Sequence, residues 1–405
     1  AAAKAATGIV TVDDKNYIHG DTFNIQFNLK TKKIVFKRAM GGLDQNSIVL
    51  FLHHYSSVNA GPLMDYYLSQ GSQGGTENDT SLPAYWQNDV SEAIDRVNTN
   101  MGEAGPSGLT VLFITDQHWD GNQKKSAALV HDVMSKTGIQ LMANGGDLIN
   151  QGGKPAMRTA MTSAIESVQY PGVFMATIFG NHDSNWVNVG DQHQHPEWQF
   201  SHNDVYGYMM SPMIRNQNLV DDFHFVNANQ DFTYTFSVKS GDGQVWRWIC
   251  ADTGTDGPVN TTSCQKIAEL LEKSTNEKII MFAHIWTNNG AKTQFTKDIE
   301  KLIDACNKST SATVSFGTFD FSNSSATSKV IMALGGHEHS DSSWTTEDGV
   351  PFVLTDSDNA DRSESTNKKA GTIGEQCFDV LTIDPVAKQI KAVRVGRGKD
   401  RQISY

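Results

Sequence analysis

Residues 173–183 read VFMATIFGNHD, an apolar run that stops at glycine, asparagine, histidine and aspartate. A continuous apolar run of this length is typical of a strand buried on both faces of an α/β sheet. Ligand sites in such sheets form where the carboxyl ends of the strands meet. The polar residues at 180–183 therefore indicate a site at the edge of a sheet.

Four other apolar segments end in the same way, each at a cluster rich in aspartate or histidine. The clusters are DQH at 116–118, GGD at 145–147, H at 284 and GGHEH at 335–339. Glycine directly precedes Asp147, Asn181 and His337 and allows the chain to turn sharply there. Five strands therefore deliver carboxylate, amide and imidazole groups to one edge.

These groups offer oxygen and imidazole nitrogen without thiolate, a set that suits divalent manganese, iron or zinc. The seven candidate ligands are Asp116, His118, Asp147, Asn181, His284, His337 and His339. Seven ligands are too many for one tetrahedral ion but fit two ions that share a carboxylate. Buried aspartate and histidine are costly unless they are paired or bind metal, which disfavours a purely structural role.

The ordered series D-x-H, G-D, G-N-H-D, H and G-H-x-H resembles the calcineurin-like metallophosphoesterases, over roughly residues 81–395. The ligands that this resemblance implies are Asp116, His118 and His339 for one metal and Asn181, His284 and His337 for the other, with Asp147 bridging both. It also implies that His182 is the general acid and that Asp183 orients it. The implied reaction is hydrolysis of a phosphoester by water that two metal ions activate as hydroxide.

Tryptophans follow several of these motifs and bear on the choice of substrate. Trp119, Trp186 and Trp286 are candidate substrate-binding residues that could stack on a sugar or base, and Trp344 lies in a similar position. Their grouping slightly favours a phosphodiester over a monoester. The alternative is that each tryptophan packs its own loop.

The net charge of −12 argues against a partner held mainly through nucleic-acid phosphates, which would require a basic surface. A nuclease shares the same motifs, so this hypothesis stays open. An anionic substrate fits the charge as well, because two bound cations would invert the local field. The four cysteines show no C-x-x-C spacing, which disfavours a structural zinc site or a redox motif.

Residues 1–80 contain short segments rich in β-branched or aromatic residues, expected as strands at 9–12, 23–29, 33–37 and 48–52, and predict a small β-rich unit. From residue 81 to residue 405, strands alternate with helices, with a strand expected at 245–251 and a helix at 293–306 among them, and adjacent strands become frequent towards the end. This order predicts an α/β fold, a four-layer α/β/β/α sandwich of two mixed sheets, as the catalytic domain. The polar stretch 187–230 is expected to form a long loop that selects the substrate.

A second hypothesis treats the chain as a virion or cell-surface attachment protein. Its β-rich unit would dock to a partner, and its phosphoesterase domain would bind or degrade a phosphate-containing cell-wall polymer. The carboxyl-terminal segments 378–384 and 393–401 are similar to phosphoesterases of cell surfaces and phage tails. This reading implies an extracellular, cell-surface or virion location. The chain is expected to be soluble, since no apolar run approaches the roughly 18–20 residues of a membrane span.

Overall fold

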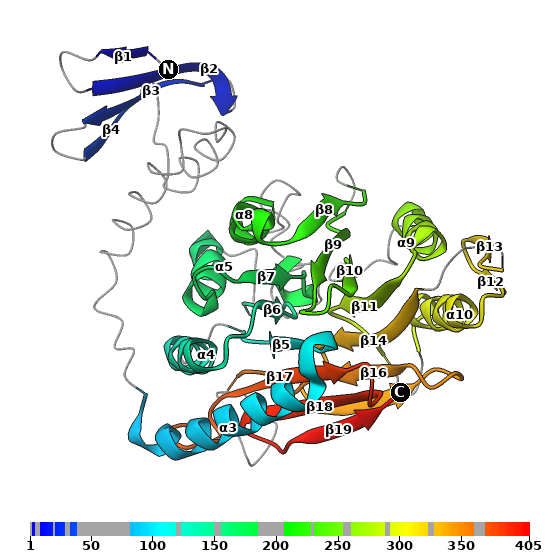
Figure 1. Cartoon of the computed structure of the whole chain (residues 1–405). Helices are drawn as coiled ribbons and strands as arrows, with labels where there is room; N and C mark the ends of the chain where they lie inside the picture. Colours follow the sequence, from blue (N-terminus) through cyan, green and yellow to red (C-terminus); the bar gives the residue numbers. More distant parts are fainter. Residues whose placement is uncertain are drawn as a thin grey trace, which may run out of the picture. The chain divides into compact units, whose positions relative to one another are not determined.

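The computed structural model describes the backbone of four amino-terminal strands together with most of the chain after residue 81. The described ranges after that point are 82–118, 123–149, 155–184, 206–227, 231–253, 261–287, 292–322, 328–359 and 369–405. The chain divides into two compact units, Ala1–Asp79 and Thr80–Tyr405 (Figure 1). Each unit is described by itself.

The first unit contains a four-stranded antiparallel sheet with the order β1-β2-β3-β4. Its strands are β1 (Ala2–Lys4), β2 (Ile9–Ile18), β3 (Asp21–Asn28) and β4 (Lys33–Arg38). Three of the strands predicted from sequence coincide with β2, β3 and β4. The segment predicted at residues 48–52 lies outside the described residues.

The second unit is built on two mixed sheets. The first has the order β19-β18-β17-β5-β6-β7, in which β5, β6 and β7 are parallel and β17 and β18 are antiparallel to their neighbours. Its strands are β5 (Leu109–Ile114), β6 (Leu141–Asn144), β7 (Phe174–Thr177), β17 (Cys377–Asp384), β18 (Gln389–Gly396) and β19 (Arg401–Ser404).

The second sheet has the order β15-β16-β14-β11-β10-β9-β8, with β10, β11, β14 and β16 parallel. Its strands are β8 (Asp221–Phe225), β9 (Tyr234–Lys239), β10 (Val245–Ala251), β11 (Glu277–Ala283), β14 (Lys329–Gly335), β15 (Ser342–Thr345) and β16 (Pro351–Leu354). A small hairpin of β12 (Ser311–Val314) and β13 (Gly317–Asp320) stands apart from both sheets.

Side-chain alternation along β10 decides which core each residue enters. Trp246 and Trp248 belong to the core between the sheets, whereas Ile249 belongs to the core beneath the helices of the second sheet. Phe113 of β5 meets Phe282 of β11 edge to face, with ring centroids 5.9 Å apart, so the two sheets pack directly together. Burial on both faces explains why β10 is almost continuously apolar.

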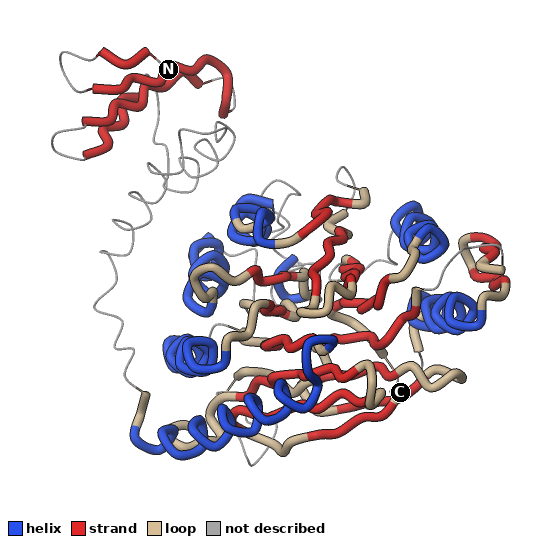
Figure 2. Tube along the Cα trace, viewed as in Figure 1, coloured by secondary structure: helices blue, strands red, loops and turns tan. Residues whose placement is uncertain are grey.

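Helices cover the outer faces of both sheets (Figures 1 and 2). The longer helices are α3 (Gln87–Ala104), α4 (Gln123–Thr137), α5 (Pro155–Val168), α9 (Thr261–Lys273) and α10 (Gln294–Lys308). Helix α3 packs on β17 and β18, with α4 beside it, while α9 and α10 share a core with the second sheet. The predicted four-layer α/β/β/α sandwich is confirmed. In the described residues, no helix combines the length and apolar character that a bilayer crossing needs.

The borders of α10 follow from its sequence. Thr293 caps the amino end by accepting a hydrogen bond from the backbone N–H of Thr296 at 3.1 Å. The helix ends at Ser309, whose φ of 55° lies in the left-handed region. Ile299 and Leu302 are fully buried on its inner face. The helix therefore begins and ends close to the range predicted from sequence.

The stretch expected to be a long loop is partly folded. Its described part contains a π-helical turn at Tyr206–Met210, followed by α8 (Ser211–Arg215) and then β8. Met209 and Met210 are fully buried. The prediction of a loop is wrong for this part, because these apolar side chains pack into the core. Residues 187–205 lie outside the described ranges.

The remaining short elements connect the larger ones. They are η2 (Ala84–Trp86), η3 (Gly105–Ser107), α6 (Asn181–Ser184) and η7 (Gln217–Leu219). All four cysteines are buried and free of disulfide bonds.

Candidate metal centre

The predicted ligands lie at the carboxyl edges of parallel strands from both sheets. Asp116 and His118 follow β5, Asp147 follows β6, and Asn181 opens α6 just after β7. His284 follows β11. The two remaining histidines, at 337 and 339, follow β14 in the second sheet. The edges of the two packed sheets meet, so residues far apart in sequence converge at one place.

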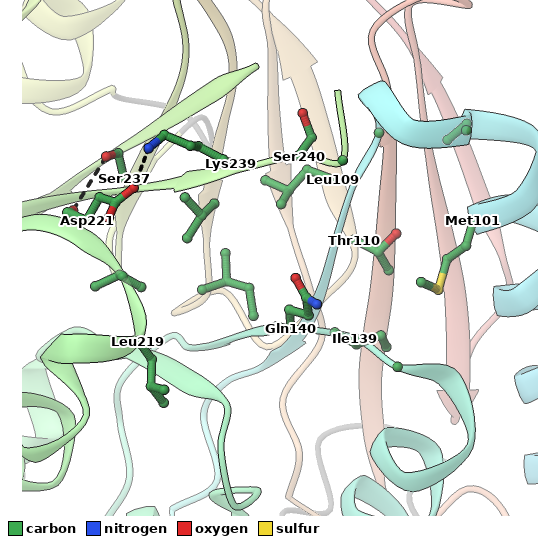
Figure 3. Close-up of a pocket in the computed structure, with 18 of the residues that line it drawn as sticks. Met101, Leu109, Thr110, Ile139, Gln140, Leu219, Asp221, Ser237, Lys239 and Ser240 are labelled. Carbon is green, nitrogen blue, oxygen red and sulfur yellow. Dashed lines mark hydrogen bonds and ion pairs between the residues drawn. The ribbon is translucent and has the colours of Figure 1, made fainter. Parts of the chain in front are cut away.

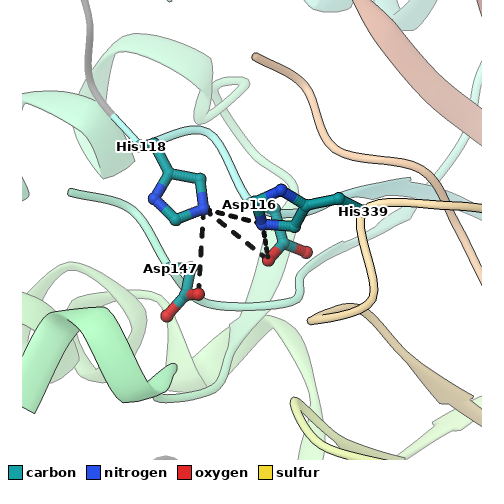
Figure 4. A group of neighbouring side chains, drawn as sticks. All are labelled: Asp116, His118, Asp147 and His339. Atoms are coloured by element: carbon teal, nitrogen blue, oxygen red, sulfur yellow. Dashed lines mark hydrogen bonds and ion pairs between the residues drawn. The ribbon is translucent and has the colours of Figure 1, made fainter. Parts of the chain in front are cut away.

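The first group comprises Asp116, His118, Asp147 and His339, whose ligand atoms all lie within 4.8 Å of one another (Figure 4). The Nε2 atoms of His118 and His339 are 2.9 Å apart. His118 Nε2 lies 3.8 Å from Asp147 Oδ2 and 3.9 Å from Asp116 Oδ1. His339 Nε2 lies 3.3 Å from the same Asp116 oxygen. Four donor atoms thus face a common point.

The second group comprises Asp147, His284 and His337. His284 Nε2 lies 3.3 Å from Asp147 Oδ2. Asn181 joins this group, because its Oδ1 lies 3.1 Å from His284 Nε2 and 2.9 Å from His337 Nδ1. Asp147 is common to both groups, and the same oxygen, Oδ2, faces both.

The hydrogen bonds of Asp116 and His284 leave one atom of each side chain directed at the centre. Asp116 Oδ2 accepts hydrogen bonds from Thr115 Oγ1 (2.7 Å) and the His337 backbone N–H (2.9 Å). Asp116 Oδ1, in contrast, is buried without a hydrogen-bond partner among the described residues. His284 Nδ1 donates to the Gly145 carbonyl at 2.6 Å, which leaves Nε2, 3.3 Å from Asp147 Oδ2, as the ring atom that would bind a metal ion. An orphaned buried carboxylate oxygen is costly, so these residues fit a divalent ion.

The charge state of the site is also suited to cations. Burial opposes ionisation of Asp116, but the neighbouring imidazoles of His339 and His284 lower its pKa to about 2. The pKa of Asp147 lies well below its ordinary value because His284 outweighs the effect of burial. Burial lowers the pKa of His118 to about 3, so its imidazole is neutral. Two carboxylates and the neutral imidazole of His118 suit a metal ion. At His284, burial is outweighed by Asp147, and the raised pKa means that this ring must lose a proton when an ion binds there.

The backbone of the site is strained. Five of the seven predicted ligands have positive φ: Asp116 at 52°, His118 at 50°, Asp147 at 51°, His337 at 73° and His339 at 49°. Each left-handed residue other than glycine costs about 1–2 kcal/mol. Such conformations persist only where surrounding contacts enforce them, and they concentrate at functional sites. The sequence showed the glycines that precede three of the ligands, but it did not show that five ligands themselves have positive φ.

Asp183 fixes loop backbones. It is fully buried, and its carboxylate accepts hydrogen bonds from the N–H groups of Leu148 (2.8 Å), Ile149 (3.3 Å) and Gly180 (3.0 Å). Burial and the neighbouring Asp147 charge raise its pKa to about 8. Asp183 thus ties the loop after β6 to the loop after β7. That Asp183 also orients His182 stays a prediction.

His182 lies beside the ligand groups. Its backbone N–H donates to Asp147 Oδ1 at 2.8 Å. Its ring packs against that of His118 at an interplanar angle of 83°, with centroids 4.8 Å apart. The side chain is partly exposed. It therefore borders the centre without belonging to either cluster of ligand atoms.

The prediction that Trp286 contacts substrate is wrong. Trp286 is fully buried, stacks on Phe295 with centroids 5.5 Å apart and donates its indole N–H to the Leu334 carbonyl at 2.9 Å. The strand end that carries His284 turns back into the core, so this tryptophan packs its loop. Trp119 and Trp186 lie outside the described residues.

Gly180 offers a test of how closely the loops after β6 and β7 must approach. A Cβ at this position would lie 2.2 Å from both the backbone N and Oδ1 of Asp147. We expect Gly180→Ala to push the two loops apart and to weaken metal binding by about tenfold or more. The measurement is metal affinity by competition with a chelating dye.

The control for that variant is Gly172→Ala. Gly172 has a φ of +76° but open space around its Cβ position, so alanine there introduces strain without a collision at the centre. Its substitution should lower the free energy of unfolding by about 1 kcal/mol and leave metal affinity unchanged. An equal loss of metal affinity in both variants would mean that general destabilisation of the fold, and not the collision at Gly180, weakens metal binding.

A separate cavity of about 370 Å³ lies at the amino ends of β5 and β6, whereas the ligand groups follow their carboxyl ends (Figure 3). Its lining includes Leu109, Gln140 and Leu219, together with an ion pair between Lys239 and Asp221 (3.0 Å). None of the predicted ligands lines this cavity. The metal-ligand groups and the cavity are therefore distinct features.

Comparison with known proteins places these loops in a family pattern. Residues 109–341 match the sequence model of the family described as calcineurin-like phosphoesterase, a range that contains every predicted ligand. The comparison with curated proteins gives no match. A dimetal phosphatase from Danio rerio superposes with a TM-score of 0.45 and 14% identity, over 74% of this chain and 99% of its own. A protein serine/threonine phosphatase from Saccharomyces cerevisiae superposes with a TM-score of 0.30 and 10% identity, over 84% and 96% respectively.

Proposed function

The chain belongs to the calcineurin-like phosphoesterase family and is a metal-dependent hydrolase of phosphoesters, and we propose that it works with two divalent ions that share Asp147. The observation that supports this proposal is the position of Asp147 Oδ2, which faces His118 at 3.8 Å and His284 at 3.3 Å. A single carboxylate oxygen between two ligand groups is the arrangement expected of a bridging ligand.

In this proposal the two groups divide the ligands between the ions. One ion is held by Asp116 Oδ1, His118 and His339, and the other by Asn181 Oδ1, His284 Nε2 and His337 Nδ1. When bound, the ions supply a water molecule of lowered pKa and neutralise charge on the phosphate oxygens. The donor set suits manganese, iron or zinc.

His182 is the proposed general acid. Its ring is partly exposed and lies beside His118, where the leaving group of a bound phosphoester would emerge. It donates a proton to the leaving oxygen as the phosphorus–oxygen bond breaks. The hydrogen bond from its backbone N–H to Asp147 Oδ1 (2.8 Å) holds the backbone of His182 beside the ligand groups without using the ring nitrogens.

The proposed substrate is a phosphodiester in preference to a monoester. The support for this choice is the position in the sequence of Trp119 and Trp186, each just after a ligand motif. Tryptophan stacks on sugars and bases, which are common substituents of diesters. The burial of Trp286 removes that residue from the argument.

Metal removal and a substrate panel test the proposal together. Chelation should abolish hydrolysis, and manganese, iron or zinc should restore it, because the ions neutralise the negative charge of the reacting phosphate. We expect a higher kcat/KM for aryl diesters than for aryl monoesters. The measurement is initial rates on matched aryl mono- and diesters at known metal content. Full activity in metal-free protein would refute the function, and a monoester preference would refute only the choice of substrate.

The compact unit Ala1–Asp79 supports a second candidate function. In this proposal the unit attaches the protein to a partner at a cell or virion surface, and the phosphoesterase unit acts on a phosphate-containing polymer there. A cell-wall polymer included in the same substrate panel distinguishes this candidate from hydrolysis of small diesters. Phosphate release from the polymer by the intact chain is the expected result.

A further inference from the structure

The loop between β14 and β15 carries two of the proposed ligands, His337 and His339, in left-handed backbone conformations. Each costs about 1–2 kcal/mol, so neighbouring contacts must hold the loop in this shape. His337 has a local support, because its backbone N–H donates to Asp116 Oδ2 at 2.9 Å. His339 lies further along the loop, two residues before Asp341.

Both ends of this loop are anchored. At its start, the Gly335 carbonyl accepts a hydrogen bond from the Thr355 backbone N–H at 3.3 Å. At its end, Asp341 Oδ1 accepts one from the Asp356 backbone N–H at 3.2 Å. The same oxygen accepts a shorter bond, 2.6 Å, from Arg394 Nη2. Arg394 belongs to β18 of the first sheet, so this contact joins the two sheets.

Arg394 is itself held rigidly. Its residue is 3% exposed, and its Nε donates to Asp379 Oδ1 at 2.8 Å. Asp379 is fully buried and also binds Thr355 Oγ1 (2.7 Å) and Arg401 Nη2 (2.5 Å). A guanidinium holds its donors in a fixed planar fork, so the bonds to Asp379 fix the direction in which Arg394 donates to Asp341. The fork joins the buried Asp379 to the loop residue Asp341.

The space around this guanidinium leaves it little freedom. A Cβ at Gly398 would lie 2.1 Å from Arg394 Nη1, which shows how closely the next turn of chain covers the group. Arg397, on the same hairpin, donates from Nε to Asp356 Oδ2 at 2.8 Å. Arg401 of β19 donates to the Leu354 carbonyl at 2.7 Å and lies 3.7 Å from Asp341 Oδ1, so the hairpin of β18 and β19 contacts the second sheet and its loops through three arginines.

We propose that Arg394 is a positioning residue of the metal centre, which acts through Asp341 to hold the His337–His339 loop in its strained shape. This inference rests on the proposed function, because it assumes that His339 binds one of the ions. Arg394 contacts neither ligand group. Its effect on His339 is transmitted through Asp341, two residues further along the backbone. The contact lies between residues 53 positions apart in the sequence.

The test removes the loop end of the contact and leaves the buried pair intact. Asp341→Ala retains the bonds between Arg394 and Asp379, so the fold should persist. We expect the apo-protein to keep its unfolding temperature, while its affinity for added Mn²⁺ or Zn²⁺ weakens by about tenfold or more. The measurements are competition with a chelating dye and thermal unfolding of the metal-free protein.

The matched control is Asp348→Ala. Asp348 lies in the turn between β15 and β16 and pairs with Lys308 at 2.6 Å, and its side chain is 21% exposed, against 29% for Asp341. Metal affinity should be unchanged in this variant. An equal loss in both variants would overturn the inference, because it would show that any loop carboxylate matters.

A second variant checks that Arg394 is the partner. Arg394→Lys keeps the charge but loses the fork that reaches two carboxylates. This variant should also weaken metal binding. The double variant Asp341→Ala/Arg394→Lys should lose little more metal affinity than the more affected single variant, because both substitutions break the bond between Arg394 and Asp341. Additive losses would show that the two residues act separately and would overturn the inference.

The outcomes separate this inference from the proposed function. If wild-type protein takes up no divalent ion, the proposed function fails and the inference fails with it. If wild-type protein binds two ions and Asp341→Ala binds them equally tightly, only the inference fails. Selective loss of affinity in Asp341→Ala and Arg394→Lys, with Asp348→Ala unchanged, supports both.

Discussion

Replacing Asp147 with asparagine should lower phosphoester turnover by more than about 10³-fold. Asp147 Oδ2 faces both ligand groups, and the charge of Asp147 outweighs the effect of burial and raises the pKa of the buried His284 to about 10. A neutral amide of the same shape lacks the charge, and its single oxygen cannot both accept the bond from the His182 N–H and face both ligand groups. The variant should therefore lose bound metal as well as activity. The measurement combines kcat on an aryl phosphoester with the number of metal ions per chain.

The control for this substitution is Asp298→Asn. Asp298 is also buried, but it lies in α10 and accepts a hydrogen bond from Gln294 Nε2 at 2.9 Å. This variant should lose some stability and keep both metals. Retention of two tightly bound ions by Asp147→Asn would refute the bridging role, whatever the loss of activity.

Replacing His182 with alanine should lower turnover by about 10²- to 10⁴-fold while both metals stay bound. The substitution removes the ring but keeps the backbone N–H that donates to Asp147 Oδ1 at 2.8 Å. The ligand geometry is therefore preserved, and only proton donation is lost. The measurement is kcat together with metal content at saturating substrate.

The choice of leaving group sharpens this experiment. A phosphoester with an acidic phenol as leaving group needs little protonation and should lose least activity in His182→Ala, whereas an alkyl ester should lose most. A loss of the same size on both substrates would exclude a role as general acid. A parallel fall in metal content would identify His182 as a ligand.

The fold was largely predictable because most of its strands are buried on both faces. Residues 245–251 were predicted as a strand and form β10 with the same borders. β9 was not predicted, although Tyr234–Lys239 alternates apolar residues with threonine and serine, a pattern that favours a strand. The turn at Tyr206–Met210 was also missed, because a five-residue π-helix is too short to show a helical period.

The ligand groups were predictable for a related reason. Each motif directly follows a strand, so the parallel order of the strands brings the seven side chains together. The role of Asp183 was not predictable, because its partners are backbone N–H groups that leave no pattern in the sequence. The contact from Arg394 to Asp341 joins different sheets, and no local spacing indicates it. Burial of Trp286 depends on the path of the chain after His284, which residue types alone do not determine.

The pairing of β5 with β17 has a consequence for the order of events during biosynthesis. β5 (Leu109–Ile114) carries the first metal motif, but one of its two neighbours is β17 (Cys377–Asp384), and the bonded pair Thr110 and Thr382 is 272 positions apart in the sequence. Pairings between segments so distant in sequence form late. A nascent chain therefore holds its first metal motif on an unfinished sheet until the ribosome has synthesised β17.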